Sequence, residues 1–257
     1  MRGEVVAREL LPGFARAGRD WAPLHELVAR HQPDVVAAGL TGYDGADLGV
    51  PMLVTNDAVT AHLGALGGEP GAVIVAGTGA IALAAGDDGW ARADGWGALL
   101  GDDGGGFWIA RRSLALALRA HDGRGGSETL RAAAEARFGS LTEIARAVYD
   151  APDPVTTVAA FTRDVIDLAR GGDADATAIL AAAGEELART VSAALDRAPS
   201  CPQRVSWSGG VFAAGDLVLD SLRARLDAEL VPPLGDGLDG AARLLDRPRR
   251  FRALIHG

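Results

Sequence analysis

The sequence has 257 residues, of which 48% are hydrophobic, so the chain can bury a large core and is not disordered. Its formal net charge of -9 argues against nucleic acid or an anionic membrane surface as the main partner. The single cysteine, Cys201, excludes an internal disulfide and a four-cysteine metal or iron–sulfur site within one chain. Lysine does not occur, so all 25 basic residues are arginines and a lysine-containing P-loop is excluded.

Apolar runs in the chain are shorter than a membrane span, and the first ten residues do not have the pattern of a signal peptide. The sequence therefore predicts a cytoplasmic protein with no membrane partner and no nucleic-acid partner.

The first part of the chain predicts two strands and a helix. Residues 4–10 alternate weakly, which is typical of a strand, and Asp20 is placed to cap a helix over residues 23–30. The continuous apolar run Val35–Leu40 predicts a strand that is covered on both faces in a parallel sheet.

A further strand is predicted at Met52–Thr55, with Asn56 and Asp57 at its carboxyl end and a helix over Ala58–Leu66. In open α/β sheets, ligands lie outside the carboxyl ends of the strands, so Asp57 is placed to act as a base. The alternative interpretation is that Asn56 or Asp57 simply caps the helix.

A glycine-rich turn follows in the centre of the chain. Apolar runs at 72–76 and 81–84 flank Gly77, Thr78 and Gly79, which predicts a β-hairpin. Backbone N–H groups and one hydroxyl in such a turn can bind a phosphate. The plainer interpretation is a tight hairpin without a ligand, because short glycine motifs are common.

Two further glycine motifs lie between this turn and the next predicted helix. Residues 94–97 read Asp-Gly-Trp-Gly, and residues 101–106 read Gly-Asp-Asp-Gly-Gly-Gly. Flexible backbone, one flat aromatic ring and paired carboxylates beside a phosphate turn point to a polyol and its phosphate donor. An ordinary loop is the alternative.

The helical periodicity of the second half predicts helices at 107–120, 128–138, 141–149, 155–170 and 174–197. Ser140 and Glu143 have the spacing of a capping box. Asp173 and Asp175 resemble a metal-binding pair, but capping of the longest helix is the preferred interpretation.

Near the C-terminus, a strand at Val205–Trp207 ends at Gly209 and Gly210, and a helix is predicted over Asp216–Leu230. A glycine pair at this point allows a flat ligand to approach the backbone closely, or it is a tight strand–helix turn. A last helix is predicted over Gly237–Leu245. The five histidines show no metal-ligand spacing, so no metal-binding residues are predicted.

Four motifs in this order resemble one family: NDA at 56–58, AGTGA at 76–80, DGWGALLGDDG at 94–104 and SGGV at 208–211. The family is that of N-acetylglucosamine kinases and BadF/BadG/BcrA/BcrD-type ATPases, in the actin-like, ribonuclease-H-like ATPase superfamily. The resemblance implies an α/β fold of two ribonuclease-H-like lobes around a central cleft. We expect an N-terminal lobe at 1–68, on which the C-terminal tail can pack, and a C-terminal lobe at 69–257.

The resemblance also implies a role for each motif. Asp57 matches the catalytic base, and the Gly77–Gly79 turn matches a phosphate loop. Gly209 and Gly210 match the adenosine motif. Positions that match the sugar pocket are Asn56, Gly95, Trp96 and Asp102. The implied activity is ATP-dependent phosphorylation of N-acetylglucosamine, glucosamine or a similar amino sugar, with Mg²⁺ as cofactor and a homodimer as the expected assembly.

Three departures from the family pattern stand out. No Asp-Gly-Gly-Gly-Thr phosphate turn occurs before Gly39, so we expect either a start upstream of Met1 or an N-terminal lobe that lacks its first two strands and is impaired. The sugar-contacting asparagine expected near Leu11–Phe14 is absent, since no Asn precedes Asn56. The family's Gly-Asp-Glu-Gly-Ser is Gly-Asp-Asp-Gly-Gly at 101–105, which keeps the charge and loses a hydroxyl.

Two other functions fit the same residues. One is a non-catalytic or impaired member that binds sugar or nucleotide without turnover. The other is the ATPase that activates a 2-hydroxyacyl-CoA dehydratase. Those activators hold an iron–sulfur cluster between subunits with cysteines from each subunit, which one cysteine per chain, Cys201, cannot supply.

Overall fold

The structure is a computed structural model that describes residue 8, residues 21–41, residue 43 and residues 45–257. Most of the strand predicted at 4–10, the proposed cap Asp20 and the segment Leu11–Phe14 lie outside the described residues. The first helix, α1, spans Ala22–His31, close to its predicted bounds.

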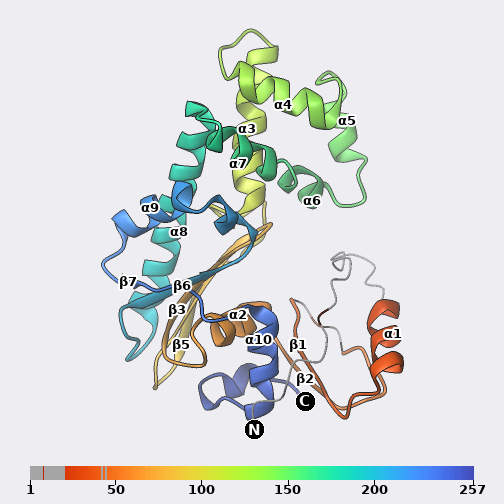
Figure 1. Cartoon of the computed structure of the whole chain (residues 1–257), viewed down its shortest axis with the longest axis vertical. Helices are drawn as coiled ribbons and strands as arrows, with labels where there is room; N and C mark the ends of the chain where they lie inside the picture. The colour runs from red at the N-terminus through yellow and green to blue at the C-terminus, as the bar shows by residue number, and fades with distance from the viewer. Residues whose placement is uncertain (1–7, 9–20, 42, 44) are drawn as a thin grey trace.

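A five-stranded mixed sheet forms the centre of the molecule, with the strand order β5-β4-β3-β6-β7 (Figure 1). Its strands are β3 (Gly71–Ala76), β4 (Ala80–Ala85), β5 (Trp90–Asp94), β6 (Arg204–Ser208) and β7 (Glu229–Leu230). β3, β4 and β5 are antiparallel, whereas β6 lies parallel to β3 and β7 lies parallel to β6. The predicted hairpin around Thr78 is therefore confirmed.

The edge strand β5 was not predicted. Its sequence, WARAD, alternates, but the side chains on its inner face are the alanines Ala91 and Ala93. Alanine buries little apolar area, so the alternation carries a weak hydrophobic signal.

A second, two-stranded parallel sheet pairs β1 (Val36–Gly39) with β2 (Met52–Thr55), and α2 (Asp57–Ala65) follows directly. The prediction that the first of these strands is buried on both faces is wrong, because all four residues of β1 are only half-buried. Among the described residues, the only strand paired with β1 is β2.

The C-terminal tail returns to this part of the molecule (Figure 1). His256 pairs with Val54 of β2, and the Thr55 hydroxyl donates to the Leu254 carbonyl at 2.8 Å. Helix α10 (Gly237–Ala242) crosses α2 at two glycines, since a Cβ on Gly64 or Gly240 would overlap the backbone of the other helix. Three short 3-10 helices complete the C-terminal part: η1 (Gly210–Ala214), η2 (Arg243–Asp246) and η3 (Arg249–Leu254).

The remaining helices are α3 (Gly106–His121), α4 (Glu128–Phe138), α5 (Ile144–Tyr149), α6 (Pro154–Ala159), α7 (Thr162–Arg170), α8 (Ala174–Arg197) and α9 (Asp216–Arg225). The bounds of α4 and α8 are those predicted. The helix predicted at 155–170 is instead divided, and the helix predicted at 216–230 ends early so that β7 can form.

The capping box predicted for α5 is wrong. The helix begins at Ile144 and Glu143 makes no side-chain capping bond. Ser140 Oγ is instead 2.7 Å from Thr142 Oγ1, because residues 141–143 form a turn rather than the first helical turn. Local hydrogen bonds of Ser and Thr compete with helical capping in this way.

Helices cover both faces of the central sheet (Figure 1). Ala72, Ile74 and Ala76 of β3 belong to a core cluster that includes buried residues of α3 and α8. Val73 points to the other face and joins a second core cluster with Val59 and Leu63 of α2. This period-2 alternation on a sheet between two helical layers is an α/β architecture, as predicted.

Candidate functional site

The turn Gly77–Gly79 is closed by a hydrogen bond from the Gly77 amide to the Gly79 carbonyl at 2.9 Å. Two backbone amides at the start of α3 donate hydrogen bonds to carbonyls of the segment Gly77–Gly79. The Gly106 amide donates to the Gly77 carbonyl at 2.8 Å, and the Phe107 amide donates to the Thr78 carbonyl at 2.9 Å.

This arrangement orients the amides of the turn. In a trans peptide the N–H points opposite to the C=O, so the Thr78 and Gly79 amides point away from α3. Neither amide donates to a backbone acceptor in the part of the chain that the structure describes, and Thr78 is exposed. Two adjacent outward amides form a concave site for an anion.

Glycine is required where α3 meets the turn. A Cβ on Gly105 would lie 2.6 Å from the Gly79 carbonyl carbon, and a Cβ on Gly106 would lie 2.9 Å from the Gly77 oxygen. The buried hydroxyl of Thr162, at the start of α7, donates to the Gly106 carbonyl at 2.6 Å. The turn is thus fixed through α3 to α7, and the break between α6 and α7 lets Thr162 reach this position.

The loop between β5 and α3 brings Asp102 to the same turn. Its Oδ1 accepts from the Gly97 amide at 3.0 Å, and its carboxylate lies against Gly79, where an added Cβ would overlap it. The predicted sugar residues Gly95, Trp96 and Asp102 therefore lie on one loop beside the predicted phosphate turn.

Trp96 is the exposed aromatic residue of this loop, with 64% of its surface accessible. The Arg92 guanidinium lies over its ring, 4.8 Å from the centroid, which holds the ring from one side. An accessible flat ring of this kind can stack on the apolar face of a sugar.

Gly209 and Gly210 lie at the carboxyl end of β6, next to the carboxyl end of β3. Gly209 has a φ of +109°, and a Cβ there would overlap the Ala76 carbonyl immediately before the phosphate turn. The structure therefore brings the predicted adenosine motif and the predicted phosphate turn to the carboxyl ends of the neighbouring strands β6 and β3.

Asn56 and Asp57 lie elsewhere, at the carboxyl end of β2 in the smaller sheet. The Asn56 side chain caps α2 by accepting from the Ala58 amide at 2.9 Å, so the capping interpretation holds for this residue. Asp57 is exposed, and its Oδ1 accepts from the same amide at 2.9 Å. Within the described residues, its hydrogen bonds stay inside α2, so its role as a base stays a prediction.

Helix α2 links the two parts of the candidate site. It packs on β3, β4 and β6, and His62 in its last turn is completely buried. His62 Nε2 lies 2.9 Å from the Gly71 carbonyl, and its ring meets Phe251 edge-on at 5.0 Å. Burial lowers the pKa of His62 to about 4, so the ring is neutral and Nε2 donates to the carbonyl.

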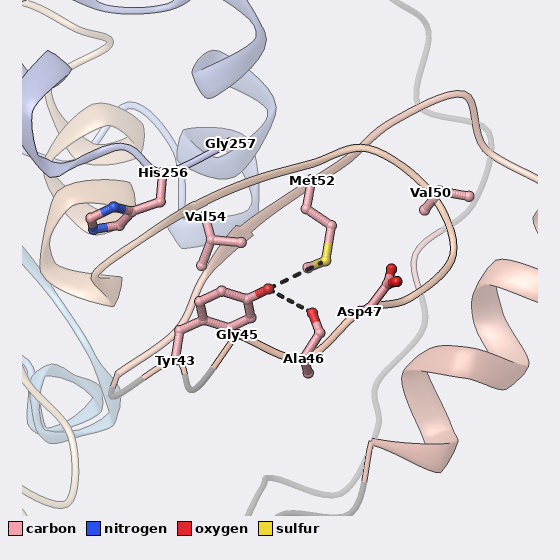
Figure 2. A pocket seen from close by; sticks show the side chains of 9 residues that line it. All are labelled: Tyr43, Gly45, Ala46, Asp47, Val50, Met52, Val54, His256 and Gly257. Carbon is pink, nitrogen blue, oxygen red and sulfur yellow. Dashed lines mark hydrogen bonds between the residues drawn. The ribbon is translucent and has the colours of Figure 1, made fainter.

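Three cavities are lined by residues other than the candidate site residues. One of about 300 Å³ is lined by Tyr43, Met52 and His256 among others; in it the Tyr43 hydroxyl donates to the Ala46 carbonyl at 2.6 Å and lies 3.9 Å from Met52 Sδ (Figure 2). A second, of about 530 Å³, lies between α1, β1 and α10. A third, of about 540 Å³, is lined by residues of α7, α8 and α9 and by Ala214 of η1, the helix that begins at Gly210.

The other acidic candidates have structural explanations. Asp173 caps α8 by accepting a hydrogen bond from the Ala176 amide at 2.8 Å. This confirms helix capping as the preferred interpretation of Asp173 and Asp175. Burial, followed by the carboxylates of Glu186 and Asp94, raises the pKa of Asp103. In the part of the chain described, no group of three or more His, Cys, Asp or Glu side chains could hold a metal ion, and no helix is long and apolar enough to cross a membrane.

Sequence reasoning missed two features of the site. One is the pair of hydrogen bonds from amides of α3 to the Gly77 and Thr78 carbonyls. These bonds join residues almost 30 positions apart, so the local sequence gives no signal for them. The other is Asp94, which accepts from the Asp102 amide at 2.8 Å and from the Asp103 amide at 3.1 Å. The sequence offered no usable signal for this second residue, because the strand β5 that ends at Asp94 was itself not predicted.

The mixed sheet with helices on both faces belongs to the actin-like ATPase fold, as its similarity to solved structures shows. A solved structure assigned as an N-acetylglucosamine kinase from Chromobacterium violaceum matches with a TM-score of 0.71 and 31% identity, covering 88% of this chain and 84% of that chain. A hexokinase of the ROK family from Thermus thermophilus has the same fold, with a TM-score of 0.50 and 19% identity over 93% of this chain and 91% of that chain.

The sequence model of the BadF/BadG/BcrA/BcrD ATPase family matches residues 11–235, and the chain belongs to this family. A curated relative, the N-acetylmuramic acid/N-acetylglucosamine kinase of Clostridium acetobutylicum, is 28% identical over 181 residues, which are 68% of this chain. The match spans 59% of that relative's length.

Proposed function

We propose that this protein is a kinase that transfers the γ-phosphoryl group of ATP to a hydroxyl of an amino sugar. The observation that carries the proposal is the junction at the edge of the central sheet, where the outward amides of Thr78 and Gly79 lie beside Asp102 and Gly209. The two amides fit a phosphate. The Asp102 carboxylate, on a loop with an exposed Trp, fits a sugar, and Gly209, where the backbone can be approached closely, fits a nucleotide.

In the proposed reaction, the sugar hydroxyl attacks the γ-phosphorus, a new O–P bond forms, and the bond to the ADP oxygen breaks. The Thr78 and Gly79 amides donate to oxygens of the transferred group, where negative charge must be stabilised. Asp57 accepts the proton of the attacking hydroxyl. Catalysis of phosphoryl transfer consists mainly of such positioning and charge stabilisation.

The sugar is assigned to the loop that carries Gly95, Trp96 and Asp102, with Asn56 as a further contact. The Asp102 carboxylate accepts hydrogen bonds from sugar hydroxyls, and the Trp96 ring covers an apolar face of the sugar. An amino sugar such as N-acetylglucosamine or glucosamine is supported by the names of the relatives in Chromobacterium violaceum and Clostridium acetobutylicum.

Mg²⁺, when bound to the nucleotide, would supply further neutralisation of the phosphate charge. Such ions are commonly bound through substrate phosphates, water and one or two carboxylates rather than by a protein cage. The exposed carboxylate of Asp57 fits the protein ligand in this mode of binding. The proposal also includes a cytoplasmic location and a homodimeric assembly.

The experiment is ADP release by the purified protein with ATP, Mg²⁺ and one sugar at a time: N-acetylglucosamine, glucosamine, N-acetylmuramic acid and glucose. The proposal expects ADP release that depends on an amino sugar and is slow with glucose. Absence of sugar-dependent release with all four would overturn it.

A second candidate is a non-catalytic sugar- or nucleotide-binding protein. It is favoured by one observation, the hydrogen bonding of Asp57 within its own helix. Calorimetric titration with N-acetylglucosamine and with ATP and Mg²⁺ separates the two candidates, because binding of both ligands without turnover supports the second.

A further inference from the structure

Asp94 occupies a special position at the end of β5. It is paired in register with Ile81 of β4, two residues after the phosphate turn. Both of its carboxylate oxygens accept backbone amides from the far end of the following loop, Oδ1 from Asp102 and Oδ2 from Asp103. Hydrogen bonds to an ionised carboxylate are stronger than those between neutral groups.

The loop closes directly over this carboxylate. A Cβ on Gly101 would overlap Asp94 Oδ1, so the backbone there passes in contact with the side chain. Asp102 makes a second link across the loop, because its own Oδ1 accepts a hydrogen bond from the Gly97 amide near the start of the loop. Two carboxylates thus hold the loop from both ends, and the second one lies against Gly79.

The hydrogen bonds of Asp94 and Asp102 hold the loop in an unfavourable backbone conformation. Asp94 has a φ of +61° and Asp102 a φ of +62°, a region that residues with a side chain adopt at a cost. The hydrogen bonds that Asp94 accepts from the Asp102 and Asp103 amides offset part of this cost at Asp102, and replacing Asp94 with Ala removes them. The loop would then sample other conformations, and the Asp102 carboxylate would leave its place beside the phosphate turn.

We propose that Asp94 is a positioning residue that holds Asp102 and the adjoining loop in the geometry needed to bind the sugar. This inference rests on the proposed kinase function for the identity of the ligand. We assign Asp94 a positioning role rather than a sugar contact, because both of its oxygens accept backbone amides of this loop. Its effect is therefore expected in sugar binding more than in ATP binding.

Kinetics of Asp94→Ala provide the first test. Loss of two bonds to an ionised group is expected to raise the KM for N-acetylglucosamine about 10- to 100-fold, whereas the KM for ATP changes less than about threefold. Asp94→Asn keeps one acceptor and is expected to fall between Ala and the wild type. The matched control is Asp122→Ala, which removes an exposed carboxylate paired with Arg124 at the far end of α3 and should leave both KM values unchanged.

Amide hydrogen exchange of the protein without sugar provides a second test that does not need turnover. Asp94→Ala is expected to speed exchange in peptides that cover residues 95–105 and to leave peptides of α8 and β3 unchanged. If Asp94→Ala loses protection throughout the chain, Asp94→Asn takes its place in both measurements.

The two tests separate this inference from the proposed function. A wild type without sugar-dependent ADP release overturns the kinase proposal, while faster loop exchange in the variant still supports the positioning role. An active wild type with unchanged sugar KM in Asp94→Ala, or unchanged exchange in residues 95–105, overturns the positioning role.

Discussion

The two sides of the candidate site are built differently. Around the turn Gly77–Gly79, each loop is held by contacts with distant parts of the chain: α3 takes the turn's carbonyls, Thr162 bonds to Gly106, and Asp94 holds Asp102. At the start of α2, Asn56 and Asp57 are exposed, and the side-chain bonds given for both within the described residues come from the amide of Ala58. The turn proposed to bind phosphate is thus preorganised, whereas among the described residues the carboxylate of the proposed base is held by its own helix alone.

This difference has a mechanistic consequence. Preorganised donors stabilise charge without reorganisation during the reaction, which suits the group that receives the phosphoryl oxygens. A base only has to come within hydrogen-bond reach of the substrate hydroxyl, and such contacts often form only when the substrate binds. The position of Asp57 relative to the turn then depends on how firmly α2 is anchored to the central sheet.

The largest expected effect is that of Asp57→Asn. If Asp57 accepts the proton, kcat should fall about 10²- to 10⁴-fold. The free energy of unfolding should change little, because Asn56 still caps the helix and Asp57 is exposed. Steady-state ADP release and urea denaturation measure the two quantities. A kcat within about tenfold of the wild type, about 1.4 kcal/mol in barrier, would remove Asp57 from the mechanism.

The next effect concerns the anchor of α2. The pKa of His62 is about 4 in the folded protein, below its ordinary value of 6.5, so the unfolded chain binds more protons between these values. The contribution of the neutral ring to stability is complete above about pH 6.5 and is lost as the pH falls towards 4. The expected loss is about 3 kcal/mol.

Urea denaturation at pH 7 and at pH 4.5 measures this loss, with His62→Leu as the control that cannot titrate. The variant should be less stable at pH 7, since the Gly71 carbonyl loses its donor, but its stability should fall less between the two pH values. An equal fall in both proteins would mean that His62 does not titrate on unfolding and would weaken the view of α2 as anchored by a neutral histidine.

The smallest effect tests the phosphate side. Gly105→Ala places a methyl group 2.6 Å from the Gly79 carbonyl carbon, and the expected cost is about 1–3 kcal/mol of stability. Gly77→Ala is the matched control, because a Cβ there meets nothing within 4 Å, and its change should stay within about 0.5 kcal/mol. Equal thermal unfolding of the two variants would show that the contact between α3 and the turn is not rigid.

Local signals allowed much of the fold to be predicted. The hairpin around Thr78 was predictable because glycines separate two apolar runs, and α8 was predictable from its cap Asp173 and its Ala/Leu periodicity. The break between α6 and α7 at residues 160–161 could not be predicted, because it depends on the fully buried Phe161 and on the hydrogen bond from Thr162 to Gly106. Such tertiary contacts override local helix propensity.

The same limit applies to the site. Gly77–Gly79, Asp102 and Gly209 could be proposed from their motifs, and the structure brings them together at one sheet edge. The roles of Asp94 and Gly105 could not be predicted, because they depend on which backbone groups face them after the loop has closed.

The most direct measurement is an experimental structure with a non-hydrolysable ATP analogue, Mg²⁺ and N-acetylglucosamine bound together. The account predicts the terminal phosphate within about 3 Å of the Thr78 and Gly79 amides, and the Asp57 carboxylate about 2.6–3.2 Å from a sugar hydroxyl that faces that phosphate. A terminal phosphate bound away from this turn, or an Asp57 carboxylate that faces no sugar hydroxyl, would contradict it.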